Sequence, residues 1–166
     1  GSYTIKEKPD YKVTNGKYTV KLSGATVQLV KDGVTTSIGT KCTFVPANYT
    51  STSNTISLKN SRYGTCKYLG DVFFYKNRYR VDKNTVVDKL HVLNRVPMEQ
   101  YLYGVIGYEI GSGSHIEALK AQAVAARGYA INQLAPGEPN YEVGDTSSYQ
   151  VYHGYDGNAR VIQAVG

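Results

Sequence analysis

Residues 97–134 read PMEQYLYGVIGYEIGSGSHIEALKAQAVAARGYAINQL. Proline is favourable at the first position of a helix, because its missing N–H would have no partner there in any case. The apolar spacing after Pro97 predicts a helix that runs to about Ile110. Glycine commonly ends helices, so Gly111 is the expected stop.

A second helix is expected from His115 to about Leu134, where alanine and other strong helix formers dominate. Ser114 and Glu117 have the spacing of a capping box at its start. The proline- and glycine-containing segment 136–139 would end it. The sequence therefore predicts two successive core helices joined by a short connector.

Residues 11–95 have a different amino-acid composition, which is rich in Thr, Val, Tyr and Lys. Apolar and polar residues alternate along 18–22, as in a half-buried strand. Further strands are expected at 27–30, 40–45, 55–58, 72–75, 79–81 and 89–94, and a loop over 48–55. The predicted fold class is α+β: an N-terminal antiparallel β-rich lobe followed by a helical lobe.

Three segments follow from these patterns. Residues 1–10 are interpreted as a tail or a tag remnant, 11–96 as the β-rich lobe, and 97–166 as the helical lobe with a short terminal helix. At 166 residues, 41% hydrophobic and 19% charged, the chain has the composition of a globular protein. No stretch approaches the roughly 18 apolar residues of a membrane span.

The net charge of +6 is unevenly distributed. Residues 1–96 carry 16 Lys and Arg against 6 Asp and Glu, whereas residues 97–166 carry 3 against 7. The basic half raises nucleic acid as a partner. Its lysines, however, are scattered singly along alternating strands, which is typical of a solvated face. We therefore expect no nucleic-acid partner, and an anionic surface such as a bacterial wall suits the charge equally well.

Three His and two Cys are too few for a zinc ribbon or finger. Cys42 and Cys66 lie 24 residues apart. Sequence alone leaves a disulfide and two thiols both open.

Glu109 stands out on a helical projection, because it lies within the apolar stripe formed by Leu102, Val105 and neighbouring residues. Lys120 and Arg127 likewise fall within the apolar stripe of the second helix. One interpretation is a buried ion pair between Glu109 and one of these cations, which would hold the helices in register. The other is a catalytic acid at the floor of a cleft.

Two blocks of this sequence resemble the SpoIID/LytB family, the sporulation stage II protein D group of bacterial cell-wall proteins. The first block runs from Leu90 to Leu134 and includes EALKAQAVAAR at 117–127. The second contains Asp145-Thr146 and QVYHG at 150–154. The resemblance is faint over residues 1–89.

The resemblance implies a lytic transglycosylase that cuts peptidoglycan glycan strands lacking stem peptides. Glu109 matches the family's catalytic glutamate. Lys120, Gln122 and Arg127 would line or brace the site, and Gln150 and Tyr152 would approach it from the opposite wall. The expected location is extracytoplasmic, in association with the cell wall, and wall amidases or other wall-remodelling proteins are expected partners.

Such an enzyme needs one carboxylate where ordinary glycosidases need two. The muramyl C6 hydroxyl of the substrate attacks the anomeric carbon, and the product carries a 1,6-anhydro ring. Two alternatives remain open: a non-catalytic module of the same family that binds the wall or enhances an amidase, and a basic surface-adhesion domain that uses residues 1–96.

The sequence departs from the family pattern in three places. Ile110-Gly111 stands where Met-Pro is common. The neighbourhood of Asp145 lacks the His and Cys that hold zinc in some members, so no metal and no cofactor are expected. The family's domain continues well beyond the Gln-Val-Tyr block, so residues 97–166 are expected to form a C-terminally incomplete lobe.

Overall fold

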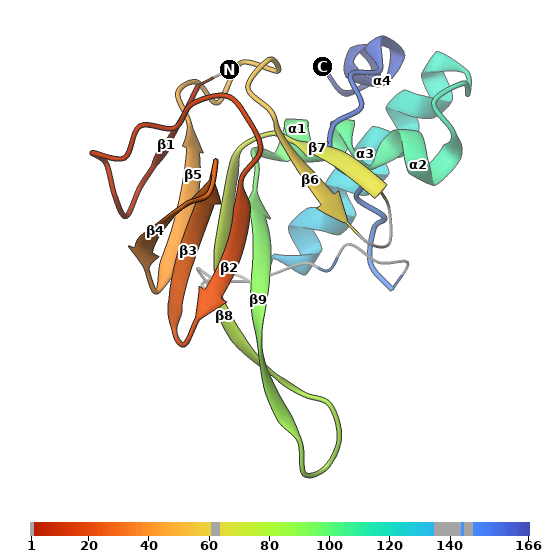
Figure 1. Ribbon diagram of the computed structural model, residues 1–166. Coiled ribbons are helices and arrows are strands. Elements are labelled where there is room, and N and C mark those ends of the chain that lie inside the picture. The colour runs from red at the N-terminus through yellow and green to blue at the C-terminus, as the bar shows by residue number, and fades with distance from the viewer. Residues whose placement is uncertain (1, 61–63, 135–143, 145–147) are drawn as a thin grey trace. The chain divides into compact units, whose positions relative to one another are not determined.

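The computed structural model of the chain describes residues 2–60, 64–134, 144 and 148–166. It divides into two compact units. The β-rich unit comprises Gly1–Thr55 and Gly70–Arg95, and the helical unit comprises Ile56–Leu69 and Val96–Gly166. Segment 56–69, which lies within the expected β-rich lobe, thus groups with the helices. The α+β fold class is confirmed (Figure 1).

The described residues of the β-rich unit form two antiparallel sheets. One has the strand order β1-β5-β8-β9, and the other has the order β2-β3-β4. Their strands are β1 (Tyr3–Ile5), β2 (Thr19–Ser23), β3 (Thr26–Lys31), β4 (Val34–Gly39), β5 (Lys41–Pro46), β8 (Asp71–Arg80) and β9 (Val86–Arg95).

Alternation of apolar residues explains why these strands bury one side. Val27 and Leu29 of β3 are fully buried, as are Cys42 of β5 and Val72 of β8. The ring of Phe44 on β5 packs edge-on against the ring of Phe74 on β8, with centroids 6.0 Å apart. These side chains form the core of the unit.

Most of the predicted strands are confirmed to within about two residues. The segments 72–75 and 79–81 belong to one continuous strand, β8, rather than two. Strand β4 was not expected because much of its sequence, VTTSIG, is polar or exposed. The predicted tail contains β1, whose residues pair with β5 from Tyr3↔Pro46 to Ile5↔Phe44.

The end of the β1 segment is anchored by Glu7. Its carboxylate accepts hydrogen bonds from the backbone N–H of Thr43 at 2.7 Å and from the Thr43 hydroxyl at 2.6 Å. Nearby, Asp71 is fully buried, and both the Arg95 guanidinium and the Tyr49 hydroxyl donate to its carboxylate. The exposed Glu7 and the buried Asp71 are therefore both held by hydrogen bonds, which a buried carboxylate requires.

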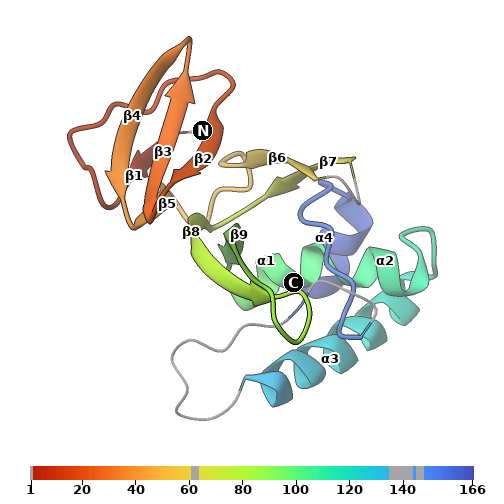
Figure 2. The ribbon, with the colours of Figure 1, turned by 60° about the horizontal axis from the view of Figure 1, so that its bottom comes forward.

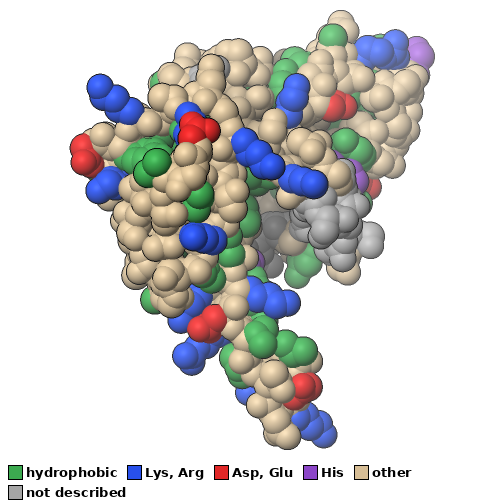
Figure 3. Space-filling view, viewed as in Figure 1, with side chains coloured by type: hydrophobic (Ala, Val, Ile, Leu, Met, Phe, Trp, Pro, Cys, Tyr) green, Lys and Arg blue, Asp and Glu red, His purple; other side chains and the backbone are tan. Residues whose placement is uncertain are grey.

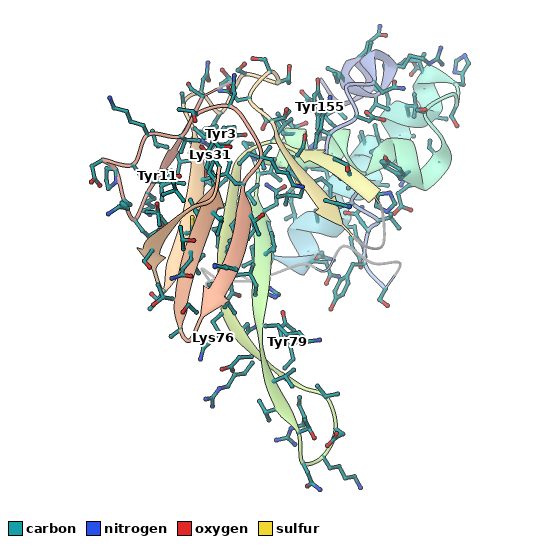
Figure 4. All side chains as sticks on the ribbon, in the orientation of Figure 1. Tyr3, Tyr11, Lys31, Lys76, Tyr79 and Tyr155 are labelled. Carbon is teal, nitrogen blue, oxygen red and sulfur yellow. The ribbon has the colours of Figure 1, made fainter. Side chains whose placement is uncertain are left out.

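Strands β8 and β9 extend past the end of β5 as a two-stranded ribbon (Figure 1). Lys76 and Tyr79 lie on this ribbon (Figure 4). Lys76 donates to Asp88 across the ribbon at 2.9 Å. On the face drawn in Figure 3, the Lys and Arg side chains of the β-rich unit stand apart rather than gathering into one patch.

The two cysteines lie in different units, Cys42 on β5 of the β-rich unit and Cys66 on the segment that groups with the helices. Cys42 is fully buried in the core of the β-rich unit, and burial together with Glu7 raises the pKa of its thiol to about 12. Cys66 lies on β7 of the helical unit.

The described residues of the helical unit form one hairpin and four helices. These are β6 (Ile56–Asn60), β7 (Gly64–Tyr68), α1 (Met98–Tyr103), α2 (Ile106–Ile110), α3 (Ile116–Gln133) and α4 (Ala159–Val165). Helix α3 lies against α1, α2 and α4 (Figures 1 and 2). Within the described residues, none of these helices has the length and apolar character that a membrane crossing requires.

The prediction of one continuous helix from Pro97 to Ile110 is wrong, because the chain breaks into α1 and α2 at Gly104 and Val105. A Cβ at Gly104 would overlap the Gly154 carbonyl oxygen and the Tyr152 ring. The break thus lies where a distant segment approaches the backbone. The stop at Gly111 is confirmed, with a φ of 84° that favours glycine.

Helix α3 confirms the second predicted helix, but its predicted capping box is wrong. His115 is the N-cap, and its Nδ1 accepts from the backbone N–H of Glu117 at 3.4 Å. The Ser114 hydroxyl instead donates to the Ile110 carbonyl at 2.6 Å. Ile131 of α3 is exposed. The residues of α3 that are buried are Leu119, Ala123, Ala126 and Ala130.

Candidate functional site

Glu109 is exposed near the end of α2, so the prediction that its carboxylate points into the core is wrong. The break at Gly104 accounts for the difference, because α1 and α2 do not share one helical projection. Oε1 of Glu109 accepts a hydrogen bond from the backbone N–H of Val151 at 3.0 Å. A segment 42 residues further along the chain therefore fixes the carboxylate.

A pocket of about 430 Å³ opens beside Glu109. Three segments of the helical unit form its walls: α2, one face of α3, and the stretch 148–150. Its lining residues are Glu109, Gln122, Ala125, Ala126, Tyr129, Ser148, Tyr149 and Gln150. The pocket thus combines one carboxylate with two primary amides, three hydroxyl groups and a small apolar wall.

The α3 wall follows from helical geometry. Gln122, Ala125, Ala126 and Tyr129 have the spacing i, i+3, i+4 and i+7, which places all four side chains on one face of a helix. Ala126 is buried and Ala125 is exposed, so this face passes from the core into the pocket. Of these four residues, the family resemblance had singled out Gln122. Ala125, Ala126 and Tyr129 were missed, because their side chains are small or uncharged and do not indicate chemistry.

The Gln150-Val151-Tyr152 block docks against α1 and α2. Oε1 of the buried Gln150 accepts from the hydroxyl of Tyr101 at 3.1 Å. The Tyr152 ring is buried, with its centroid 5.1 Å from that of Tyr101 and 6.0 Å from that of Tyr68. Burial raises the pKa of the Tyr152 phenol far above its ordinary value. Gln150 therefore faces the pocket, while Tyr152 packs behind it.

Two glycines allow this close docking. Gly154 has a φ of 77°, and a Cβ there would overlap the carbonyl oxygen of Lys67 on β7. The next residue, Tyr155, donates its backbone N–H to the same oxygen at 2.7 Å. Gly104, at the end of α1, likewise has no side chain and leaves room for the Gly154 carbonyl oxygen and the Tyr152 ring. These backbone contacts hold the 150–155 segment between the hairpin and α1.

Lys120 and Arg127 lie away from Glu109. Lys120 is exposed and donates to Glu117 at 2.8 Å. Arg127 binds both carboxylate oxygens of Glu99, at 3.0 and 2.6 Å, and also donates to the Val165 carbonyl at 3.4 Å. Among the ion pairs of the described residues, none involves Glu109, so the buried-pair alternative is wrong.

The structure brings together some of the residues expected at the site and separates others. Glu109, Gln122 and Gln150 share the pocket, with Tyr152 directly behind it. Arg127 instead joins α3 to α1 and to the end of α4. Tyr101 was not singled out by the sequence, because its contact with Gln150 spans 49 residues.

The described residues contain no group of three or more His, Cys, Asp and Glu that could hold a metal ion. Asp145, Thr146 and Ser147, in the block where the sequence predicts no metal, lie outside the described residues, as does the segment 136–139.

Residues 87–166 match the model of the family described as "Stage II sporulation protein", SpoIID. The chain is 30% identical to an uncharacterized protein of Brachyspira hyodysenteriae over 170 residues, which covers 98% of this chain and 42% of that protein. It is 34% identical to the amidase enhancer of Bacillus subtilis over 155 residues, 93% of this chain and 19% of the relative.

A third relative is the stage II sporulation protein D of Bacillus amyloliquefaciens, 34% identical over 67 residues, 37% of this chain and 20% of that protein. The chain thus spans less than half the length of each of these relatives. No solved structure matches the chain. Residues 87–166, which contain Glu109 and the described residues that line its pocket, match the model of the SpoIID family.

Proposed function

We propose that this chain is a peptidoglycan lytic transglycosylase domain in which Glu109 is the acid and base. The observation that carries the proposal is the position of Glu109: an exposed carboxylate, held by the Val151 N–H, that lines a pocket of about 430 Å³. Glu109 is the single carboxylate among the described residues that line this pocket. The pocket therefore suits a mechanism that uses one carboxylate.

The reaction would proceed in two proton transfers. Glu109 first donates its proton to the glycosidic oxygen, and the bond between that oxygen and the anomeric carbon breaks. The C6 hydroxyl oxygen of the muramyl residue then bonds to the anomeric carbon, and Glu109 accepts the hydroxyl proton. The products are a shortened strand and a 1,6-anhydromuramyl end, and the carboxyl group is restored.

The hydrogen bond to Val151 assigns different tasks to the two carboxyl oxygens. Oε1 is already bound to the backbone N–H, so Oε2 is the oxygen that would carry the transferred proton. Fixing the carboxyl plane in this way lowers the cost of orienting it toward the glycosidic oxygen. Gln122 and Gln150 would bind polar groups of the sugars on either side.

The test is digestion of purified glycan strands lacking stem peptides, with mass spectrometry of the products. The chain should release fragments with anhydro ends, and Glu109→Gln should abolish them. Glu117→Gln is the matched control, since Glu117 is an exposed carboxylate on α3 that pairs with Lys120. Products that persist unchanged with Glu109→Gln would refute the role of Glu109.

A second candidate is a non-catalytic, extracytoplasmic module that binds the wall and enhances an amidase. It is favoured by the 34% identity to the amidase enhancer, which extends over 93% of this chain and so includes the β-rich unit. The net positive charge of residues 1–96 would suit an anionic wall. This candidate predicts sedimentation with wall material and faster hydrolysis by a wall amidase, with no anhydro products.

A further inference from the structure

The orientation of the Glu109 carboxylate depends on one backbone donor. Glu109 is exposed, and within the described part of the chain the group that binds its carboxylate is the Val151 N–H, at 3.0 Å from Oε1. A long exposed side chain loses rotamer freedom when it is held in one conformation, so a single hydrogen bond holds it only if the donor itself is fixed. Whatever fixes Val151 therefore bears on the orientation of the carboxylate.

Tyr101 of α1 contacts both neighbours of Val151. Its hydroxyl donates to Oε1 of Gln150, the residue before Val151, at 3.1 Å. Its ring packs against the ring of Tyr152, the residue after Val151, with centroids 5.1 Å apart. Gln150 is 7% exposed and Tyr152 is 9% exposed, so both contacts are largely shielded from water. One side chain thus holds the chain on either side of the donor.

The backbone anchors of the same segment lie further along the chain. The N–H of His153 donates to the Gly104 carbonyl at 3.4 Å, and the N–H of Tyr155 donates to a carbonyl of β7 at 2.7 Å. These contacts lie two and four residues after Val151. At Val151 itself, the side chain of Tyr101 supplies a contact to each neighbouring residue.

The phenol of Tyr101 is suited to this task. Burial raises the pKa of Tyr101 to about 12, and Tyr129 and Glu109 act in the same direction. The hydroxyl therefore keeps its proton at neutral pH and remains a donor. Because its ring packs against Tyr152, the hydroxyl has little freedom to turn away from Gln150.

We propose that Tyr101 is a positioning residue for Glu109: its hydroxyl, acting through Gln150, holds the Val151 N–H in the place from which it orients the carboxylate. The inference deepens the proposed function and rests on it for the reaction. Proton transfer depends on the orientation of the carboxyl group. Removal of the Tyr101 hydroxyl should therefore lower kcat and change KM much less.

The first measurement reports on the hydrogen bond and needs no activity. The amide proton shift of Val151, measured by NMR, should move upfield when Glu109→Ala removes the acceptor. Tyr101→Phe keeps the ring and removes the hydroxyl, and it should move the same proton upfield as well. A residue that only stabilised the fold would leave this shift of the native state unchanged.

The second measurement is kinetic. Tyr101→Phe should lower kcat for release of anhydro fragments about three- to tenfold, the factor that corresponds to one hydrogen bond. Tyr103→Phe is the matched control, because Tyr103 is also on α1 but its ring faces Tyr155. It should leave both kcat and the Val151 shift unchanged.

A double-mutant cycle tests whether Tyr101 acts through Gln150. Gln150→Met keeps the length of the side chain but removes the oxygen that accepts from the Tyr101 hydroxyl. Tyr101→Phe should therefore lower kcat in the unmodified chain and have little effect in Gln150→Met. Equal effects in both backgrounds would overturn the proposal. If Tyr101→Phe does not fold, Gln150→Met breaks the same contact from the other side and should also move the Val151 proton upfield.

In an active chain, an unchanged Val151 shift or an unchanged kcat in Tyr101→Phe would each overturn the proposal. Its failure and the failure of the proposed function are distinguishable. An upfield shift in a chain that releases no anhydro fragments would keep the link between Tyr101 and Val151 and refute the proposed function. Anhydro fragments that require Glu109 but not the Tyr101 hydroxyl would support the proposed function and refute this inference.

Discussion

The backbone N–H of Val151 lies 3.0 Å from Oε1 of Glu109 and donates a hydrogen bond to it. This contact joins the two blocks of sequence that resemble the SpoIID family, since Glu109 belongs to the first and Val151 to the second. The Gln-Val-Tyr block thus has a structural task in addition to lining the pocket: it holds the carboxylate. The contact also sets the geometry on which the first prediction depends.

Shortening Glu109 by one methylene should show how far the rate depends on the position of the carboxylate, because its charge is kept. Glu109→Asp keeps a carboxylate but withdraws it by more than 1 Å, and misplacement on that scale costs about 100-fold in rate. We expect kcat for release of anhydro fragments to fall by about that factor while KM changes little. Glu117→Asp should leave both constants unchanged. Full activity in Glu109→Asp would show that the carboxylate position is not critical.

Replacing Gly154 by alanine should destabilise the helical unit. The φ of 77° is costly for alanine, and the new Cβ would overlap the Lys67 carbonyl oxygen. Together these effects should lower the free energy of unfolding by about 3 kcal/mol. The comparison is Gly113→Ala, where a Cβ meets nothing within 4 Å, and urea denaturation measures both. Equal stability of the two variants would contradict the proposed close docking of the 150–155 segment.

Arg127 should contribute to the stability of the helical unit rather than to glycan binding. A double-mutant cycle with Arg127→Ala and Glu99→Ala should give a coupling free energy of about 0.5–1 kcal/mol, because the pair is bidentate but partly exposed. The cycle for Lys120 and Glu117, which are both largely exposed, should give a smaller coupling. Loss of glycan binding by Arg127→Ala without loss of stability would instead place Arg127 at the pocket.

Stability should decline at alkaline pH. The pKa values of Tyr3 and Tyr101 are each raised from 10.0 to about 12, chiefly by burial. Because the folded state holds these protons more tightly than the unfolded state, their contribution is complete below pH 10 and is lost as pH rises from about 10 to about 12. Urea denaturation across this range should show a falling free energy of unfolding.

Phenylalanine variants isolate this effect from other groups that titrate at high pH. Tyr3→Phe removes a phenol that donates to the Asn54 carbonyl at 2.9 Å, and Tyr101→Phe removes the one bound to Gln150. Each variant should be less stable at neutral pH but should show a shallower decline above pH 10. A decline as steep as that of the unmodified chain in both variants would mean that other groups cause it.

Elements with strong local signals could be predicted from sequence. Helix α3 was recognisable because alanine and other helix formers run through it, and Gly111 ended α2 as expected. Strands with alternating apolar residues were found, whereas β1, β4 and β7 were missed. Their stability depends on pairing with partners elsewhere in the chain, as with β1 and β5, and short segments carry little information about that pairing.

The helical projection singled out Glu109 for a reason that the structure corrects. It assumed one helix from 97 to 110 and therefore placed Glu109 toward the core. The break lies at Gly104, where Tyr152 and Gly154, some 50 residues away, approach the backbone, and no local pattern records that approach. Glu109, which follows the break, is exposed to solvent beside a pocket.

The sequence by itself determined the α+β class, the long helix α3 and the two blocks that resemble the SpoIID family, and it singled out Glu109 as the candidate catalytic residue. These results depend on local composition and on the spacing of neighbouring residues. Only the tertiary structure decided which groups surround that carboxylate. It separates Lys120 and Arg127 from Glu109 and brings Val151, Gln122 and Gln150 to it. The physical reason is that these contacts join segments far apart in the chain, whose docking requires the gaps left by Gly104 and Gly154.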